Sequence, residues 1–216
     1  MSEDMFPIYT LGERRMDHLV HMVALAWAVV AIPLLFIGVA PWGDAAMLVA
    51  CLLYSLGLLW MLGFSAAYNR VQAPRVKSIL RRLDHAGIFV MIAGSYAPFA
   101  LVKLSSTLGN GILVFIWALA LVGIYMSLRL PGRADKAMIF LCLTMGWSVV
   151  VIMPSLVAAV SSSVLVLLVI GGVLYTSGVM FHLAKRLRYH NAIWHVFVLA
   201  AVVCHYIAIF LALKAA

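Results

Sequence analysis

The sequence predicts an all-α polytopic membrane protein, and three observations lead to that fold class. Hydrophobic residues make up 66% of the 216-residue chain, and the mean hydropathy is +1.13. Apolar runs of about 20 residues, the length that crosses a bilayer as a helix, recur along the whole chain. The basic residues are concentrated in alternate connections between these runs. Together these features predict a seven-transmembrane helical bundle.

Each apolar run is expected to form one span, with ends placed to within about two to four residues. The spans cover about residues 18–39, 45–68, 84–102, 111–128, 137–153, 163–181 and 193–213. Pro154 and the serines at 161–163 separate the fifth span from the sixth. Residues 1–17 are polar and mixed in charge, without the short apolar core of a signal peptide, and we interpret them as an N-terminal arm. Residues 18–216 are expected to form a single membrane domain.

The positions of lysine and arginine predict how the chain is oriented. Thirteen of the 15 lie in the N-terminal arm and in the connections after the second, fourth and sixth spans. Only Lys103 and Lys214 lie on the opposite side. By the positive-inside rule the arm is cytoplasmic and the C-terminus is outside, which requires an odd number of spans. We expect an inner (plasma) membrane protein, and basic residues scattered over short loops argue against nucleic acid as a partner despite the net charge of +8.

Polar side chains at membrane depth predict a site. They gather at the cytoplasmic ends of four spans: Asp17, His18 and His21; Ser65 and Asn69; Asp84; and Asn191 and His195. Ser65 and Asn69 are four residues apart, as are Asn191 and His195, so each of these pairs shares a helical face. Ionisable residues inside a membrane are costly and are usually functional, so we predict a polar pocket that faces the cytoplasm. The simpler alternatives are that Asp84 caps the third span and that His195 is a hydrogen-bonded core histidine.

Five segments resemble the hemolysin III family, within the larger group that includes the progestin and adiponectin receptors. They are YTLGE at 9–13 with His21, SAAYN at 65–69, DHAGI and IAGSYAP at 84–98, GGVLYTSG at 171–178, and NAIWH at 191–195 with His205. They occur in order over nearly the whole chain. The resemblance implies the same seven spans and the same cytoplasmic N-terminus.

The resemblance also implies a zinc ion near the inner leaflet. It would be held by Ser-x-x-x-His on the second span and His-x-x-x-His on the seventh, while an aspartate on the third span holds the zinc-bound water. In this sequence Ser65 and Asp84 take the catalytic positions and His195 takes one metal position. Asn69 and Asn191 stand at the two other histidine positions, and we assign both to the ligand pocket.

Two asparagines weaken this metal site, because an amide oxygen is a poor substitute for an imidazole as a zinc ligand. We therefore expect no bound cofactor, with a hydrogen-bond network in its place. Zinc is the alternative, and His21, His85 or His190 would then complete the ligand set. His21 is also assigned to the ligand pocket.

Three functions follow for a protein with such a degenerate site. The first is a role in membrane-lipid homeostasis, or lipid binding or sensing, with a membrane lipid as the partner. The alternative is a zinc-dependent hydrolase of a lipid amide or ester, so the sequence leaves open whether the protein is an enzyme. The second alternative is a pore, which the family name implies, although no span carries a continuous polar stripe.

Overall fold

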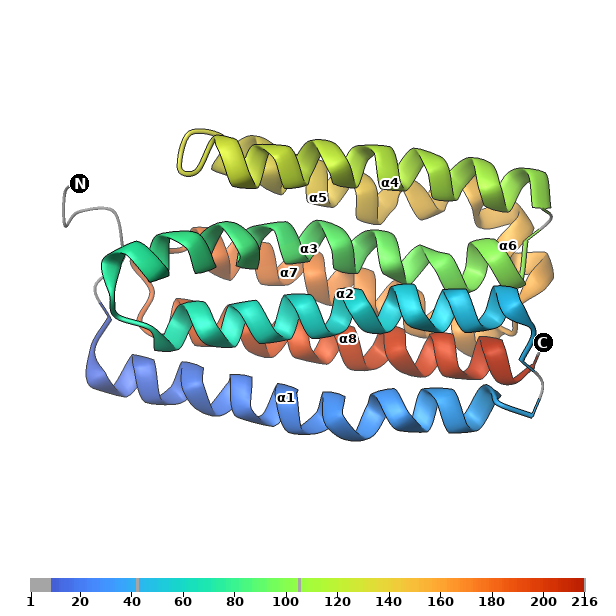
Figure 1. Ribbon diagram of the computed structural model, residues 1–216, viewed down its shortest axis with the longest axis horizontal. Coiled ribbons are helices and arrows are strands. Elements are labelled where there is room, and N and C mark those ends of the chain that lie inside the picture. The colour runs from blue at the N-terminus through green and yellow to red at the C-terminus, as the bar shows by residue number, and fades with distance from the viewer. Residues whose placement is uncertain (1–8, 42, 105, 216) are drawn as a thin grey trace.

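The computed structural model describes residues 9–41, 43–104 and 106–215, and these form a bundle of roughly parallel and antiparallel helices (Figure 1). Seven helical stretches are long and apolar enough to cross a membrane, which confirms the predicted fold class. The helices are α1 (Leu11–Val39), α2 (Ala45–Arg70), α3 (Pro74–Val102), α4 (Ser106–Arg129), α5 (Asp135–Trp147), α6 (Met153–Ala159), α7 (Ser162–Leu183) and α8 (His190–Lys214). The start of α1 and the end of α8 lie at opposite ends of the bundle, as an odd number of spans requires (Figure 1).

Two helices, α1 and α3, begin furthest ahead of the starts that the apolar runs predict. The first, α1, starts at Leu11 rather than near residue 18, because a capping box closes its first turn: the Glu13 amide donates to Thr10 Oγ1 (3.3 Å) and the Thr10 amide donates to Glu13 Oε2 (2.8 Å). In α3, Pro74 occupies the first turn, where its missing N–H costs nothing. Asp84 therefore lies in the interior of α3, about 15 Å from its start, and the interpretation of Asp84 as an N-cap is wrong.

The fifth span is interrupted rather than ended near Pro154. A 3-10 segment, η2 (Ser148–Ile152), joins α5 to α6, and the whole span runs from Asp135 to Ala159. Pro154 lies in the first turn of α6, where a proline is tolerated. The predicted end at residue 153 is therefore corrected to 159, and the serine-rich connection after it begins α7.

Glycines allow two helix pairs to approach closely. A Cβ added to Gly94 of α3 would lie 2.6 Å from the Leu53 carbonyl oxygen, and one added to Gly57 of α2 would lie 2.8 Å from the Met91 Cα. Such contacts are backbone to backbone, so α2 and α3 form a tightly packed pair. On α7, a Cβ at Gly171 would meet the ring of His205, so α7 and α8 also approach closely at this glycine.

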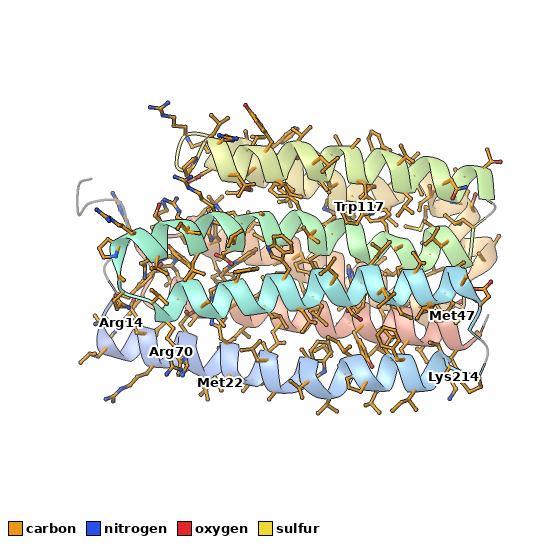
Figure 2. All side chains as sticks on the ribbon, viewed as in Figure 1. Arg14, Met22, Met47, Arg70, Trp117 and Lys214 are labelled. Atoms are coloured by element: carbon orange, nitrogen blue, oxygen red, sulfur yellow. The ribbon has the colours of Figure 1, made fainter. Side chains whose placement is uncertain are left out.

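The two ends of the bundle differ in charge. Figure 2 shows Arg14 and Arg70 at the end where α1 begins, with Met47 and Lys214 at the other end. At the first end Arg81 of α3 forms an ion pair with Asp135 of α5 (3.1 Å). We call this the N-terminal end of the bundle, and it is also where the polar side chains gather.

Candidate functional site

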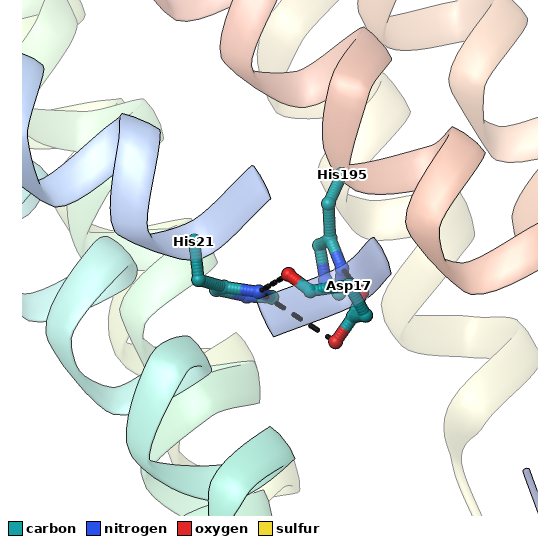
Figure 3. A group of neighbouring side chains, drawn as sticks. All are labelled: Asp17, His21 and His195. Carbon is teal, nitrogen blue, oxygen red and sulfur yellow. Dashed lines mark hydrogen bonds and ion pairs between the residues drawn. The ribbon is translucent and has the colours of Figure 1, made fainter. Parts of the chain in front are cut away.

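Polar side chains from α1, α2, α3 and α8 meet between these helices, at the N-terminal end of the bundle. Asp17 and His21 are four residues apart and so project from one face of α1. His195 of α8 points toward both of them (Figure 3). Asp17 lies six residues after Leu11, or about 9 Å along the helix axis, so the group is about two turns from the helix end.

A hydrogen bond between α1 and the connection before α8 brings these two helices into register. The Tyr189 amide donates to Glu13 Oε1 (3.1 Å), one turn before Asp17. Tyr189 has a left-handed backbone (φ 62°), and α8 starts at the next residue. Because Glu13 also closes the capping box of α1, one carboxylate orders the starts of both helices.

Asp17 is the centre of the group, and its side chain is almost entirely buried, with the residue 6% exposed. Its Oδ1 accepts hydrogen bonds from His195 Nδ1 (2.6 Å) and from Asn191 Nδ2 (3.1 Å). Its Oδ2 lies 3.6 Å from His21 Nδ1. A carboxylate buried in this way needs positive or hydrogen-bonding partners, and two imidazoles and one amide supply them.

His21 links this group to α2. Its Nδ1 lies 2.7 Å from the Asp17 carbonyl oxygen and its Nε2 lies 3.1 Å from Ser65 Oγ. The rings of His21 and His195 meet edge to face, with centroids 4.3 Å apart. Both His21 and Ser65 are buried, so the contact is held inside the bundle.

The two asparagines extend the network between α2 and α8. Asn191 Nδ2 is shared between Asp17 and Asn69 Oδ1 (3.4 Å), and Asn69 Nδ2 donates to the Ser65 carbonyl oxygen (3.0 Å). Their amides therefore connect α1, α2 and α8 at one level. This is the hydrogen-bond network that two asparagines at these positions predict.

Asp84 of α3 reaches the same level from the fourth helix. Its side chain lies next to Ser65 and within electrostatic range of Asp17 and His195. The site therefore holds two carboxylates, Asp17 and Asp84.

The structure brings together all six residues assigned from the sequence: His21, Ser65, Asn69, Asp84, Asn191 and His195. The Asp17 carboxylate contacts three other side chains of the group. The sequence identifies Asp17 only as a polar residue at the end of the first span and does not predict its role. Its spacing of four from His21 was the available signal. His190 does not join the group: it is buried beside the ring of Tyr9, at a centroid distance of 5.8 Å.

An apolar cavity of about 190 Å³ lies deeper in the bundle, between α3, α5, α7 and α8. Most of its lining is aliphatic and aromatic, and His205, one of the few polar groups there, donates from Nε2 to the Leu168 carbonyl oxygen (3.2 Å). Two lining residues, Trp147 and Val169, are 45% and 52% exposed on the outer surface. The cavity therefore reaches the lipid-facing side of the bundle between α5 and α7.

The cavity begins one helical turn from the polar network. Ile88 lines it and lies four residues after Asp84, on the same face of α3. Met61 is four residues before Ser65, and Trp194 of the lining is the neighbour of His195. A molecule with a polar end and an apolar chain would meet both regions in this order.

These features define a class: a seven-span helical membrane protein with a buried carboxylate–histidine network beside an apolar cavity. Comparison with known proteins identifies the family. The profile of the family described as "Haemolysin-III related" matches residues 11–206. The chain belongs to this family.

Its relatives include bacterial and animal proteins. The hemolysin-3 homolog of Bacillus subtilis (strain 168) is 33% identical over 192 residues, which cover 89% of this chain and 90% of that protein. Hemolysin-3 of Bacillus cereus is 33% identical over 179 residues, 83% of this chain and 82% of that protein. The human monocyte to macrophage differentiation factor is 30% identical over 167 residues, 73% and 67% of the two chains.

The residues at the zinc positions implied by the resemblance do not fit that metal. Asn69 and Asn191 offer neutral amides, and the Asn191 amide nitrogen is directed at Asp17 rather than at a shared ion site. Of the expected imidazoles only His195 is present, and it faces the carboxylate of α1.

Proposed function

We propose that this protein binds a membrane lipid, with an acyl chain in the apolar cavity and the polar headgroup at the Asp17 network, and that it acts in membrane-lipid homeostasis. The observation that carries the proposal is the order of three features along one path: the polar network, then the apolar cavity, then the opening of the cavity on the side of the bundle. An apolar cavity of about 150 Å³ in another protein stays dry and takes up apolar molecules, so a cavity of this size is suited to part of a chain. A chain could enter from the bilayer between α5 and α7.

Lipid mass spectrometry of the purified protein tests this proposal. Gly172 lines the cavity and a Cβ there would have no atom within 4 Å, so Gly172→Leu fills the cavity without a backbone clash. We expect the unmodified protein to retain a lipid through purification and Gly172→Leu to lose most of it. The matched control is Gly63→Leu, because Gly63 of α2 has equally open surroundings but is outside the cavity. Equal lipid content in both variants and the unmodified protein would contradict the proposal.

A lipid amide or ester hydrolase is the second candidate. The observation in its favour is that Ser65, Asp84 and His195 lie one turn from the cavity, where the polar linkage of a bound lipid would be placed. Incubation with defined ceramides and phospholipids, followed by analysis of released fatty acids, tests it. Turnover that disappears in Asp84→Asn would favour the hydrolase, whereas lipid retained intact would favour binding alone.

The proposed orientation places the network near the cytoplasmic leaflet of the inner (plasma) membrane. It rests on the 13 basic residues at the N-terminal end of the bundle. An alkaline phosphatase fusion at the C-terminus should be active, and a fusion between α2 and α3 should be inactive. The reverse pattern would move the network to the outer leaflet.

A further inference from the structure

We propose that the deep part of the apolar cavity contains a subsite for a hydroxyl group on an otherwise apolar chain, formed by Tyr175 of α7 and His205 of α8. Both residues line the cavity. His205 follows His195 by ten residues, so it lies about 15 Å further along α8, well inside the bilayer. The proposal rests on lipid binding in the cavity and narrows the lipid to one whose chain carries a hydroxyl.

The hydrogen bond of His205 determines which of its ring nitrogens can accept. Nε2 lies 3.2 Å from the Leu168 carbonyl oxygen, and a carbonyl only accepts, so Nε2 carries the hydrogen. In a neutral imidazole the other nitrogen, Nδ1, is then an acceptor. The neutral form is expected because a charged side chain is costly at this depth. Among the described residues, none donates a hydrogen bond to Nδ1.

Tyr175 supplies the complementary donor. Its ring meets the His205 ring edge to face, with centroids 5.5 Å apart, so the two side chains share one stretch of the cavity wall. In the part of the chain that the structure describes, the Tyr175 hydroxyl has no hydrogen-bond partner. A purely aliphatic chain would leave this donor and the Nδ1 acceptor of His205 unsatisfied, which is unfavourable in a water-free interior.

A third hydroxyl near this pair is also unsatisfied. Tyr54 of α2 is fully buried (0% exposed), and its hydroxyl finds no hydrogen-bond partner within the described ranges. It lies within electrostatic range of Tyr175. Buried polar groups are nearly always hydrogen-bonded, so unpaired groups gathered in one region indicate that a further polar group completes them.

A hydroxyl fits this arrangement better than other polar groups on an apolar chain. It can accept from the Tyr175 hydroxyl and donate to His205 Nδ1 at the same time. A ketone can accept from Tyr175 but cannot donate to His205. A charged group would be costly at this depth. Most of the remaining lining is aliphatic and aromatic, so it accommodates the chain on either side of the hydroxyl.

Competition between hydroxystearates tests the subsite. The full-length protein in detergent is delipidated and incubated with an equimolar mixture of hydroxystearates that differ in the position of the hydroxyl along the chain. The bound acids are then extracted and quantified by liquid chromatography and mass spectrometry. We expect a narrow range of mid-chain positions to be enriched about threefold to tenfold over the others, the factor that one net hydrogen bond contributes.

Tyr175→Phe removes the donor, keeps the ring and should abolish most of this enrichment. Tyr96→Phe is the matched control, because Tyr96 also lines the cavity but its hydroxyl already donates to the Met145 carbonyl oxygen (2.7 Å). The preference among the isomers should persist in Tyr96→Phe. An unchanged preference in Tyr175→Phe, or an equal loss in both variants, would overturn the proposal.

Two comparisons on the unmodified protein keep the test decisive where a variant fails to fold. A ketostearate with its oxygen at the preferred position should bind more weakly than the hydroxystearate, and equal binding would contradict the assignment of a hydroxyl donor to His205. Equal binding of stearate and every hydroxystearate would overturn the subsite and leave the lipid proposal standing. Binding of neither stearate nor any hydroxystearate would overturn both proposals.

Discussion

The two sides of the bundle are packed in different ways. On one side α2 and α3 are in backbone contact through Gly57 and Gly94, and α1 and α8 complete a four-helix group that carries the whole polar network. On the other side the cavity separates α5 from α7. Among the described residues, the hydrogen bond that joins α5 to α7 runs from Trp147 Nε1 to Thr176 Oγ1 (3.2 Å).

This difference separates two tasks that a membrane protein with an internal site must perform. Buried carboxylates and imidazoles require fixed partners, and close helix packing holds them in place. Entry of a molecule from the bilayer requires a contact that opens at low cost. We call the first side the packed side (α1, α2, α3 and α8) and the second the open side (α5, η2, α6 and α7).

The largest effect on stability is expected from Asp17→Ala. The change leaves His195 Nδ1 and the Asn191 amide without their acceptor inside the bundle. Removal of one partner from a buried charged pair costs about 3–5 kcal/mol in the free energy of unfolding. Reversible unfolding in mixed detergent would measure it. Asp44→Ala is the control, because Asp44 only caps α2 at the other end of the bundle, and loss of a cap costs about 1 kcal/mol. Similar losses in both variants would remove the distinction between the two sites.

A smaller but sharper contrast is expected between Gly94→Val and Gly172→Val. On the packed side the new side chain meets the Leu53 backbone, whereas on the open side it enters the cavity. Overpacking costs about 1–3 kcal/mol, while valine in an open helical position is slightly better than glycine. Unfolding of the two variants under the same conditions would show the difference. If Gly172→Val were the less stable variant, the open side would be packed more tightly than the structure shows.

The smallest effect on stability is expected from Thr176→Val, which removes the acceptor of Trp147 Nε1 and keeps the shape of the side chain. A typical hydrogen bond contributes about 0.5–1.5 kcal/mol. Access to the cavity should change more than stability, and Cys142 of the lining reports it through its rate of modification by a lipid-soluble maleimide. The measurement uses a protein in which the other two cysteines, Cys51 and Cys204, are replaced by alanine. In that background, Thr176→Val should raise the rate of Cys142 modification several-fold.

Thr144→Val provides the control for that measurement. The Thr144 hydroxyl donates to the Phe140 carbonyl oxygen of its own helix and, in the described part of the chain, forms no hydrogen bond to another helix. Its removal should leave the rate at Cys142 unchanged. An equal rise in both variants would show that the hydrogen bond between α5 and α7 does not control entry.

The fold could be predicted because spans are local properties of the sequence. Apolar length and the positions of basic residues are read one segment at a time, and both pointed to seven spans. The starts of α1 and α3 were placed too late for a physical reason. Their first turns are polar, as in the run from Pro74 to Arg82, and a helix held by a capping box or an initial proline continues beyond its apolar part.

The site could be predicted in composition but not in arrangement. Depth along each span identified Ser65, Asn69 and His195 because polar residues are rare there. The central role of Asp17 depends on which face of α1 meets α8, and spacing within one helix does not determine that. The cavity was not predicted at all, because it arises where side chains of four helices fail to fill the space between them.

The contact between Asp17 and His195 also has a consequence for how the protein is made. The two residues are 178 positions apart, and they belong to the first and the last span. At a synthesis rate of about 5–20 residues per second, α1 would wait roughly 10–35 s for its partner to emerge. During that interval a carboxylate lies on a membrane segment without the imidazole and the amide that satisfy it later, a burden of about 2.5–3.5 kcal/mol at the bilayer centre and less near the interface.

The first span therefore carries this cost until translation is nearly complete. Chains that stop before α8 would carry an unpaired acid on α1 and should be recognised as unfinished. When α8 is inserted, it supplies the hydrogen-bond donors that Asp17 of α1 lacks. The network can therefore form only after the whole chain has been synthesised.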